Sequence, residues 1–328
     1  MQIDINSIAK EYRKKNILVV GDIILDAYVY GKVDRISQEA PVPIVSIERQ
    51  EFKPGGAANV ALNLSGLGAA VTVIGVVGKD SNHDQLKKCL SGPGQEKIKN
   101  EIIECGSRPT SIKTRIIADG RQIARLDNEF TEEISDKYVS LVIDSFNNNC
   151  GDADGIIIQD YNKGLLTKKL VAHIVDHADH QSVPVYVDPK YNNYEAYRGV
   201  RLFKPNLKEY AAIAKEKKFG ALPDSGFDFK NYMGTEILLL TLGPDGMSLY
   251  YDDNHESIPT KARQVYDVSG AGDTVIAAFA INDLCGLSPL ESSVISNLAA
   301  GRVCEEAGVC PITLDSLKDI FFHHHNTD

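Results

Sequence analysis

The segment ILVVGD (residues 17–22) is the first of six short apolar runs that decide the fold. The others are VTVIGVVG (71–78), GIIIQD (155–160), PVYVDP (184–189), RLFKPN (201–206) and EILLLTLG (236–243). Continuous apolar runs of this length are typical of strands buried on both faces of a parallel sheet. Helical patterns lie between or after them, near residues 57–67, 80–90, 136–148, 165–179, 207–215, 272–284 and 290–307. This alternation predicts an α/β protein with a mostly parallel central sheet.

Polar residues stand where several of these runs end, namely Asp22, Asp160, Asp188, Asn206 and Thr241. In doubly wound sheets, ligands bind outside the carboxyl ends of the strands. These residues are therefore candidates for a ligand site, while turn formation or helix capping explains each of them about as well.

Two stretches interrupt this rhythm, DAYVYGKVDRISQEAPVPIVSIERQEF (26–52) and RPTSIKTRIIADGRQIARLDNE (108–129). Both alternate like exposed antiparallel strands, and Asp119-Gly120 is a two-residue hairpin signal. Together they predict a small sheet that projects from the main domain and could serve as a lid, a dimer surface or both.

The second stretch is also basic, with the cations Arg108, Lys113, Arg115, Arg121 and Arg125 against the single acid Asp119 up to residue 125. We expect pairing across the hairpin to place Lys113 and Arg115 on one face and Arg121 and Arg125 on the other. A solvated hairpin is the alternative to a substrate-facing one.

The composition narrows the class of protein. The chain has 328 residues, with 35 Lys and Arg against 45 Asp and Glu, which gives a net charge of −10. This balance argues against binding to nucleic acid or to an anionic membrane. The start, MQIDINSIAKEYRKKN (1–16), is polar, and no apolar run approaches the roughly 20 residues of a membrane span. We expect a cytoplasmic protein in which FFHHHNTD (321–328) is a C-terminal tail.

The segment DVSGAGDTV (267–275) carries the strongest chemical signal. Backbone N–H groups of Gly270, Ala271 and Gly272 at a helix N-terminus would suit a phosphoryl group. Asp273 directly behind them could accept a proton from an attacking hydroxyl, or it could be an ordinary acid at a helix start. The chain has no P-loop and no G-x-G-x-x-G after its first strand, so those nucleotide-binding classes are unsupported.

Three motifs in order, PGGAANVALNLSGLGAAVTVIGVVG (54–78), KPNLKE (204–209) and DVSGAGDTVIAAFA (267–280), resemble those of the ribokinase-type (pfkB) carbohydrate kinases. The resemblance implies a ribokinase-like three-layer α/β sandwich with a small projecting β-sheet lid. Residues 1–320 would form one kinase domain, with lid segments at about 26–53 and 108–128.

The resemblance also implies the roles of particular residues. Asp273 would be the general base, and Gly270, Ala271 and Gly272 would form the anion hole. ATP and Mg²⁺ would bind near Asn206, Glu209, Thr241, Gly243, Gly246 and Asn297, with Asn206 and Glu209 placing the metal; K⁺ is a further candidate cofactor. Sugar hydroxyls would contact Asp22, Asp26, Gly55, Gly56 and Asn59. From the residues alone, Asn206 and Glu209 equally match a helix capping box, and Gly55-Gly56 a turn.

Longer stretches resemble the heptose 7-phosphate kinases within this family: GDIILDAYVYGKVDRISQEAPVPIV (21–45), RPTSIKTRIIADGRQIARLD (108–127), QDYNKG (159–164) and VDPK (187–190). The implied reaction phosphorylates the anomeric hydroxyl of D-glycero-β-D-manno-heptose 7-phosphate to the 1,7-bisphosphate, a step toward ADP-heptose and the lipopolysaccharide core. Arg108, Lys113, Lys163 and Lys190 are candidates for the substrate phosphate, with surface charges as the alternative. A homodimer through the lid is expected.

Some features leave alternatives open. Tyr191 follows VDPK where this group would have glycine, which puts the contact of Lys190 in doubt. A kinase for ribose, fructose or a hexose phosphate is the second interpretation, and a non-catalytic sugar or nucleotide sensor is the third. This kinase is also found fused to an adenylyltransferase; no H-x-G-H motif of such a partner is present, and a stand-alone kinase and a domain of a longer protein both remain open.

Overall fold

The computed structural model describes residues 4–92, 94–260 and 265–325. Among these residues a nine-stranded sheet runs in the order β13-β12-β11-β10-β9-β8-β1-β4-β5. Its strands are β1 (Asn16–Gly21), β4 (Ala70–Gly78), β5 (Ile98–Cys105), β8 (Gly155–Gln159), β9 (Val185–Asp188), β10 (Leu202–Phe203), β11 (Ile237–Thr241), β12 (Met247–Tyr251) and β13 (Asn254–Ile258). Neighbours from β5 to β11 pair in parallel, and β12 and β13 add an antiparallel edge. The predicted parallel sheet is confirmed.

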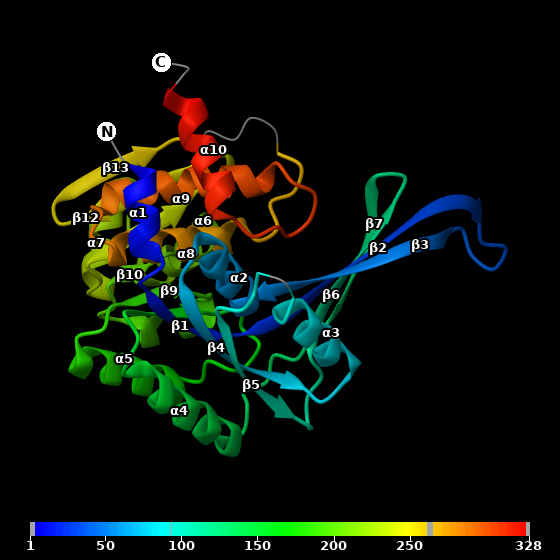
Figure 1. Ribbon diagram of the computed structural model, residues 1–328, viewed down its shortest axis with the longest axis horizontal. Helices are drawn as coiled ribbons and strands as arrows, with labels where there is room; N and C mark the ends of the chain where they lie inside the picture. Colours follow the sequence, from blue (N-terminus) through cyan, green and yellow to red (C-terminus); the bar gives the residue numbers. More distant parts are fainter. Residues whose placement is uncertain (1–3, 93, 261–264, 326–328) are drawn as a thin grey trace.

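Helices cover both faces of this sheet and make a three-layer sandwich (Figure 1). One face carries α1 (Ile5–Tyr12), α2 (Ala57–Leu67), α3 (Ser81–Leu90), α8 (Ala271–Leu284), α9 (Pro289–Cys304) and α10 (Leu314–His325). The other carries α4 (Asp136–Cys150), α5 (Lys168–Gln181), α6 (Leu207–Lys217) and α7 (Ser225–Met233). Successive side chains of β1 point to opposite faces of the sheet. Val19 packs into the hydrophobic core on the first face, and Leu18 and Val20 pack into the core on the second. Burial on both faces explains why the strands are continuous apolar runs.

The sheet reverses its winding between β1 and β8. The chain passes from β1 outward to β4 and β5, and then returns to build β8, β9, β10 and β11 on the other side of β1. Such a switch point leaves a crevice outside the carboxyl ends of the two central strands. Asp22 follows β1, and Tyr161 lies two residues beyond the end of β8, so both belong to this crevice.

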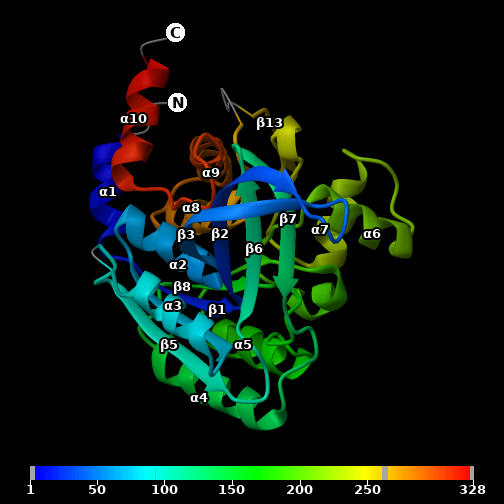
Figure 2. The same ribbon diagram turned by 90° about the vertical axis from the view of Figure 1, so that its right-hand side faces the viewer.

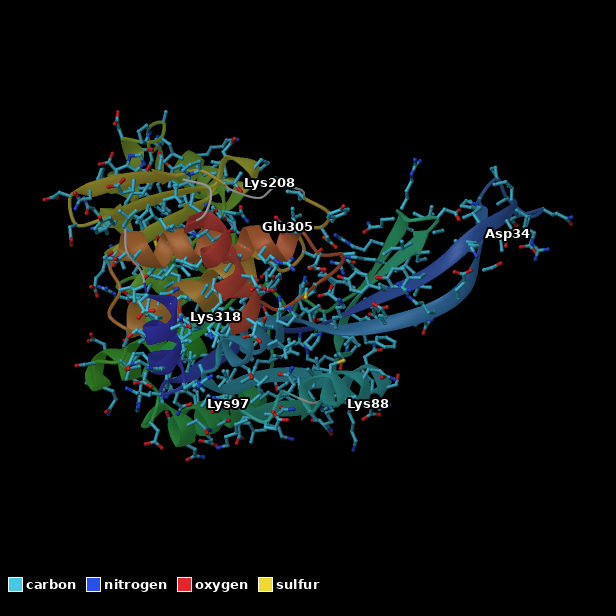
Figure 3. All side chains as sticks on the ribbon, turned by 45° about the horizontal axis from the view of Figure 1, so that its top comes forward. Asp34, Lys88, Lys97, Lys208, Glu305 and Lys318 are labelled. Atoms are coloured by element: carbon cyan, nitrogen blue, oxygen red, sulfur yellow. The ribbon has the colours of Figure 1, made fainter. Side chains whose placement is uncertain are left out.

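The two interrupting stretches form a separate four-stranded sheet in the order β3-β2-β6-β7, which we call the lid. Its strands are β2 (Ile23–Ile36), β3 (Pro43–Gly56), β6 (Ser111–Ala118) and β7 (Arg121–Asn128). The lid extends away from the sandwich, and Asp34 marks its far end (Figures 1 and 3). Figure 2 shows β2, β6 and β7 standing in front of the central sheet. The predicted projecting sheet is confirmed, and so is the hairpin, since Asp119 and Gly120 have φ of 51° and 74°.

The pairing of the lid strands contradicts two expectations from the sequence. Its hairpins are joined by parallel pairing of β2 with β6, although only antiparallel strands were expected. Arg125 lies directly opposite Arg115, so both occupy one face together with Lys113, and the predicted placement of Arg125 is wrong. A register shift between Ile116 and Ile117 separates this part of β7 from Arg121, which pairs with Ala118 on the opposite face as predicted. A bulge of this kind cannot be counted from residue spacing.

Other elements were missed or misplaced in the sequence. The expected tail at 321–328 overlaps helix α10, which continues to His325, and Phe321 is buried against the core. The edge strands β5 and β13, the strand β12 beside β13, and the helices α1 and α7 were not predicted. Edge and surface elements carry a weaker apolar signal than buried ones, although β12 itself is mostly buried. Among the described residues, no helix is long and apolar enough to cross a membrane.

Candidate active site

Asp273 lies in the first turn of α8, and its carboxylate is held at the switch point by three donors. Asn59 of α2 donates through Nδ2 to Oδ2 at 2.8 Å. Gln159 Nε2 and the Tyr161 hydroxyl donate to Oδ1 at 3.0 and 2.8 Å. Asp273 is 2% exposed, and burial together with the nearby Asp188 charge raises its pKa to about 7, against the lowering effect of the hydrogen bonds from Asn59 and Tyr161. A carboxylate with such a pKa is suited to take a proton at neutral pH.

The start of α8 forms a cradle of backbone N–H groups beside this carboxylate. Gly270 caps the helix with φ of 82°, and a Cβ added there would lie 2.8 Å from Asn59 Nδ2. Within the described residues, the N–H groups of Gly272 and Asp273 have no acceptor, whereas the N–H of Ala271 donates to the Val268 carbonyl at 3.2 Å. Among the described residues, the N–H groups left free at this helix start are thus those of Gly272 and Asp273, while the N–H of Ala271 is engaged in this structure. The anion hole of Gly270, Ala271 and Gly272 stays a prediction.

A buried ion pair lies directly behind this cradle. Lys204 Nζ and Asp188 Oδ2 are 3.0 Å apart, and Lys204 is 2% exposed. A Cβ on Gly272 would lie 3.7 Å from both atoms. The ammonium group thus adds positive charge close to the backbone N–H groups. It was not predicted, although Lys204 stands in the KPN motif.

The predicted sugar residues of the switch point divide into two groups. Asp22 Oδ2 accepts the backbone N–H groups of Tyr161 at 2.8 Å and Lys163 at 3.0 Å, so this carboxylate holds the loop after β8. Burial and the neighbouring Asp160 raise the pKa of Asp22 to about 6. Asn59 is likewise committed to Asp273. Both residues therefore hold neighbouring parts of the site in place, and their contact with sugar hydroxyls stays a prediction.

Asp26, Gly55 and Gly56 lie where the lid joins the sandwich. A Cβ on Gly55 would approach Asp26 Oδ2 to 2.3 Å, and one on Gly56 would approach the Asp22 carbonyl to 2.3 Å, so both positions need glycine. Asp26 forms an ion pair with Arg115, whose guanidinium also lies 3.5 Å from the Ser269 hydroxyl. Arg115 was seen in the sequence as one of several cations and was not assigned to the site.

A cavity of about 620 Å³ opens between the inner face of the lid and the main domain. Tyr28, Tyr30 and Arg115 line it from the lid, and Asp267 and Gly308 line it from the domain. Its volume falls in the range of small-molecule sites. It adjoins Asp26 through Arg115, so a ligand held at Asp273 can extend beneath the lid.

Three of the four cations assigned to a substrate phosphate converge near the base of the lid. Glu129 bridges Lys113 and Lys163, with both oxygen–nitrogen distances at 2.7 Å. The Arg108 guanidinium donates to the carbonyls of Phe130 and Lys163. Lys113 also pairs with Asp127 at 3.1 Å, and Arg125 pairs with the same carboxylate at 3.0 Å. Asp127 and Glu129 thus pair with Lys113, Lys163 and Arg125, while Arg108 donates to carbonyl oxygens. We call these four cations with their two carboxylates the cation cluster, whose four positive and two negative charges leave a formal charge of +2.

Lys190 lies apart from the cation cluster. Its ammonium group pairs with Glu209, and its Nζ lies 5.3 Å from the centre of the Tyr161 ring. Glu209 and Asn206 form the capping box of α6: Asn206 Oδ1 accepts from the N–H groups of Lys208 and Glu209 at 2.9 Å, and Glu209 Oε2 accepts from Asn206 N at 2.8 Å. Lys190 is therefore placed with the predicted nucleotide and metal residues.

These residues fit Mg²⁺. The second carboxylate oxygen of Glu209 points away from the cap and holds a cation, the ammonium of Lys190, which marks a place where positive charge is favoured. Mg²⁺ takes oxygen ligands, commonly one or two protein groups completed by phosphate and water. Within the described residues, no group of three His, Cys, Asp or Glu side chains could hold a metal ion by itself.

The remaining nucleotide residues line the same side of the sheet. Thr241 forms a β-bridge with Asn206, and Gly243 and Gly246 flank a tight turn with φ of 63° and 88°. Asn297 of α9 donates to the Pro259 carbonyl at 2.8 Å and borders a cavity of about 180 Å³. Ile258, Val294 and Leu298 are among its apolar walls. A small, mostly apolar cavity with one amide in its wall suits a nucleotide base.

Solved structures identify the class of fold. The chain is similar to phosphofructokinase-2 from Escherichia coli in complex with potassium, with a TM-score of 0.77 and 18% identity over 94% of this chain and 98% of that one. It is also similar to Arabidopsis thaliana ribokinase complexed with ribose and ATP, with a TM-score of 0.68 and 18% identity over 93% and 98% of the two chains. The fold is that of the ribokinase-like sugar kinases.

Sequence comparison gives the family. The model of the pfkB family carbohydrate kinases matches residues 14–315, and the chain belongs to this family. It is 39% identical to the bifunctional protein HldE of Nitratiruptor sp. over 308 residues, which are 93% of this chain and 65% of that protein. It is 40% identical to the bifunctional protein HldE of Aliarcobacter butzleri over 313 residues, or 94% and 64%. The chain spans less than two thirds of the length of these relatives.

Proposed function

We propose that this chain transfers the γ-phosphoryl group of ATP to the anomeric hydroxyl of D-glycero-β-D-manno-heptose 7-phosphate, forming the 1,7-bisphosphate on the route to ADP-heptose and the lipopolysaccharide core. The observation that carries the proposal is the buried Asp273, whose carboxylate lies beside unpaired N–H groups at a helix start. The similarity to HldE proteins supports the choice of sugar. The cytoplasm is the proposed location of this reaction.

The geometry supports in-line phosphoryl transfer. The anomeric hydroxyl gives its proton to the Asp273 carboxylate while its oxygen bonds to the γ-phosphorus. The bond from that phosphorus to the β,γ-bridging oxygen breaks, and ADP leaves. The free N–H groups of Gly272 and Asp273, with Lys204 behind them, stabilise the charge on the transferred group.

The nucleotide would bind along Asn206, Thr241, Gly243 and Gly246, with its base beside Asn297. When bound, Mg²⁺ supplies charge neutralisation for the phosphate oxygens. Glu209 and Asn206 would hold the metal, and Lys190 would be released from Glu209 to contact a phosphate. K⁺ is a further candidate cofactor, to be tested by exchanging it for Na⁺ in the assay.

The cation cluster is the proposed site of the sugar's own phosphate. Arg108, Lys113 and Lys163 carry the excess of positive charge, and Lys113 lies opposite Asp26 in the register of the lid. A phosphate there would be within the same site as the sugar hydroxyls at Asp26. Phosphate recognition by several cations explains why an acidic protein keeps a local positive group.

A homodimer through the lid is the proposed assembly. Ile47, Ile123 and Leu126 of the lid are each at least 45% exposed, and β3 and β7 are the two edges of its sheet. Exposed sheet edges with apolar side chains favour pairing with another copy. Sedimentation of the wild type against an Ile47→Lys, Leu126→Lys variant tests this assembly.

The deciding experiment measures ADP release with Mg²⁺ and ATP across a panel of sugars. The panel contains the β-heptose 7-phosphate, the unphosphorylated heptose, ribose, fructose and fructose 6-phosphate. A kcat/KM at least 100-fold higher for the heptose 7-phosphate is the expected result. Preference for a neutral sugar would keep the role of Asp273 and reject the heptose. Binding without turnover across the panel would reject the kinase proposal in favour of a sensor.

A further inference from the structure

The two oxygens of the Asp273 carboxylate are not equivalent. Oδ1 accepts two hydrogen bonds, from Gln159 Nε2 and from the Tyr161 hydroxyl. Oδ2 accepts one, from Asn59 Nδ2. An ionised carboxylate oxygen accepts about two hydrogen bonds in its plane. Oδ1 is therefore filled by the protein, and Oδ2 keeps one position open.

We infer that Tyr161, together with Gln159, is a positioning residue that fixes Asp273 so that Oδ2 receives the proton of the acceptor hydroxyl. Two donors, one at the end of β8 and one in the loop after it, prevent rotation of the carboxylate about its last bond. The same donors favour the ionised form, which is the form that acts as a base. This inference rests on the proposed function of Asp273 as the general base.

The surroundings of Gln159 support a functional arrangement. Its Nε2 donates to both Asp273 and Asp188, each at 3.0 Å. Its Oε1 is buried and has no partner within the described residues. A buried acceptor without a partner costs stability, and such costs are concentrated at functional sites. The Gln159 side chain is oriented so that its Nε2 donates to two carboxylates, although its Oε1 then has no hydrogen-bond partner among the described residues.

The surroundings of Tyr161 make it a donor. Burial, together with the charges of Asp273 and Asp188, raises the pKa of its hydroxyl well above the ordinary value, so the group stays protonated. Its backbone N–H is fixed by Asp22. The charged groups that act on Asp273 are Asp188, which raises its pKa, and Lys204, which lowers it. Tyr161 is uncharged, and it lowers the pKa of Asp273 through its hydrogen bond alone.

The test compares Tyr161→Phe with Tyr197→Phe. Tyr197 is a matched control because it is buried and donates through the same kind of bond, at 2.8 Å, to Asp160 in the same loop. Two quantities are measured in each protein: the pH dependence of kcat/KM for the preferred sugar, and the pKa of Asp273 in the ligand-free protein by ¹³C carboxyl NMR.

Loss of one hydrogen bond to the ionised form should raise the pKa of Asp273 by about one unit in Tyr161→Phe. The acid limb of kcat/KM should move to higher pH by the same amount. At pH 6 kcat should fall about tenfold with the KM for sugar unchanged, and it should recover above pH 8, because a shift of one unit changes the ionised fraction about tenfold. Tyr197→Phe should move neither quantity.

The two readouts separate failure of this inference from failure of the proposed function. An unchanged pKa of Asp273 in Tyr161→Phe would overturn the inference, and so would an equal shift in Tyr197→Phe. A shifted pKa in a protein that phosphorylates no sugar would keep the hydrogen-bond assignment but reject the positioning role along with the proposed function.

Discussion

The buried anion Asp273 and the cations of the cation cluster are stabilised in opposite ways. Asp273 is buried, and neutral donors fix it: an amide from α2, an amide from β8 and one phenol. The cation cluster lies near the base of the lid, where Lys113, Lys163 and Arg125 form ion pairs with Asp127 and Glu129. Neutral donors stabilise the negative charge of Asp273 without neutralising it. In the cation cluster, carboxylates pair with the cations until an anion that binds more strongly replaces them.

From this difference we infer that the Asp273 site carries out the phosphoryl transfer and that the cation cluster selects the substrate. The Asp273 site is built on a helix start and on strand ends of the sandwich, so its geometry is rigid before any ligand binds. The cation cluster is carried by the lid and by two loops, and its partners can be exchanged. Mutations in the first region should therefore change kcat, and mutations in the second should change KM for the phosphorylated sugar.

The largest effect is expected at the base itself. Asp273→Asn removes the proton acceptor, and kcat should fall about 10³-fold or more. Binding of ATP should be nearly unchanged, because Asn206, Thr241 and Asn297 are not in contact with Asp273. Steady-state turnover and a fluorescent nucleotide titration measure the two quantities. Turnover within threefold of the wild type would remove Asp273 from the mechanism.

A smaller effect is expected at the glycine that starts α8. In Gly270→Ala, the new Cβ would meet Asn59 Nδ2 at 2.8 Å and the residue would keep a φ of 82°. Asn59 must then move off Asp273, and we expect kcat to fall about 100-fold, as for a misplacement of about 1 Å. Activity at saturating substrate checks this expectation.

Gly286→Ala is the matched control for Gly270→Ala. Gly286 follows the other end of α8 with φ of 85°, and a Cβ there meets nothing within 4 Å. It carries the same backbone strain without the contact, so it should lower the melting temperature without lowering kcat. Equal losses of kcat in both variants would assign the effect to strain instead of to Asn59.

The rigid region was the more predictable one from sequence. The apolar runs predicted six strands of the central sheet, and the glycines of residues 270–272 predicted the helix start. The role of Asp273 as the base stays a prediction. The donors Gln159 and Tyr161 were missed even though QDYNKG was noted, because nothing in their spacing shows that they meet a helix more than 100 residues away. Lys204 was missed for the same reason.

The lid was predictable as a projecting sheet and not in its details. Alternation identified its strands, but the bulge that separates Arg121 from Arg125 depends on local backbone geometry. Lys190 was grouped with the phosphate cations because its sequence neighbours suggested it. Its ion pair with Glu209 depends on how helix α6 packs beside the end of strand β9, which the identities of single residues do not show.

The smallest of the expected effects should distinguish the role of Lys163 from that of Lys190. Lys163→Met removes a cation of the cluster and should raise KM for a phosphorylated sugar about tenfold, with kcat and KM for ATP nearly unchanged. Lys190→Met should raise KM for ATP instead, because its partner Glu209 belongs to the nucleotide side. Arg121→Met, on the opposite face of the lid, is the control and should change neither constant.

If Lys163→Met and Lys190→Met raised the same KM, the cation cluster and the nucleotide side would form one phosphate site, and the separation of substrate choice from chemistry would fail.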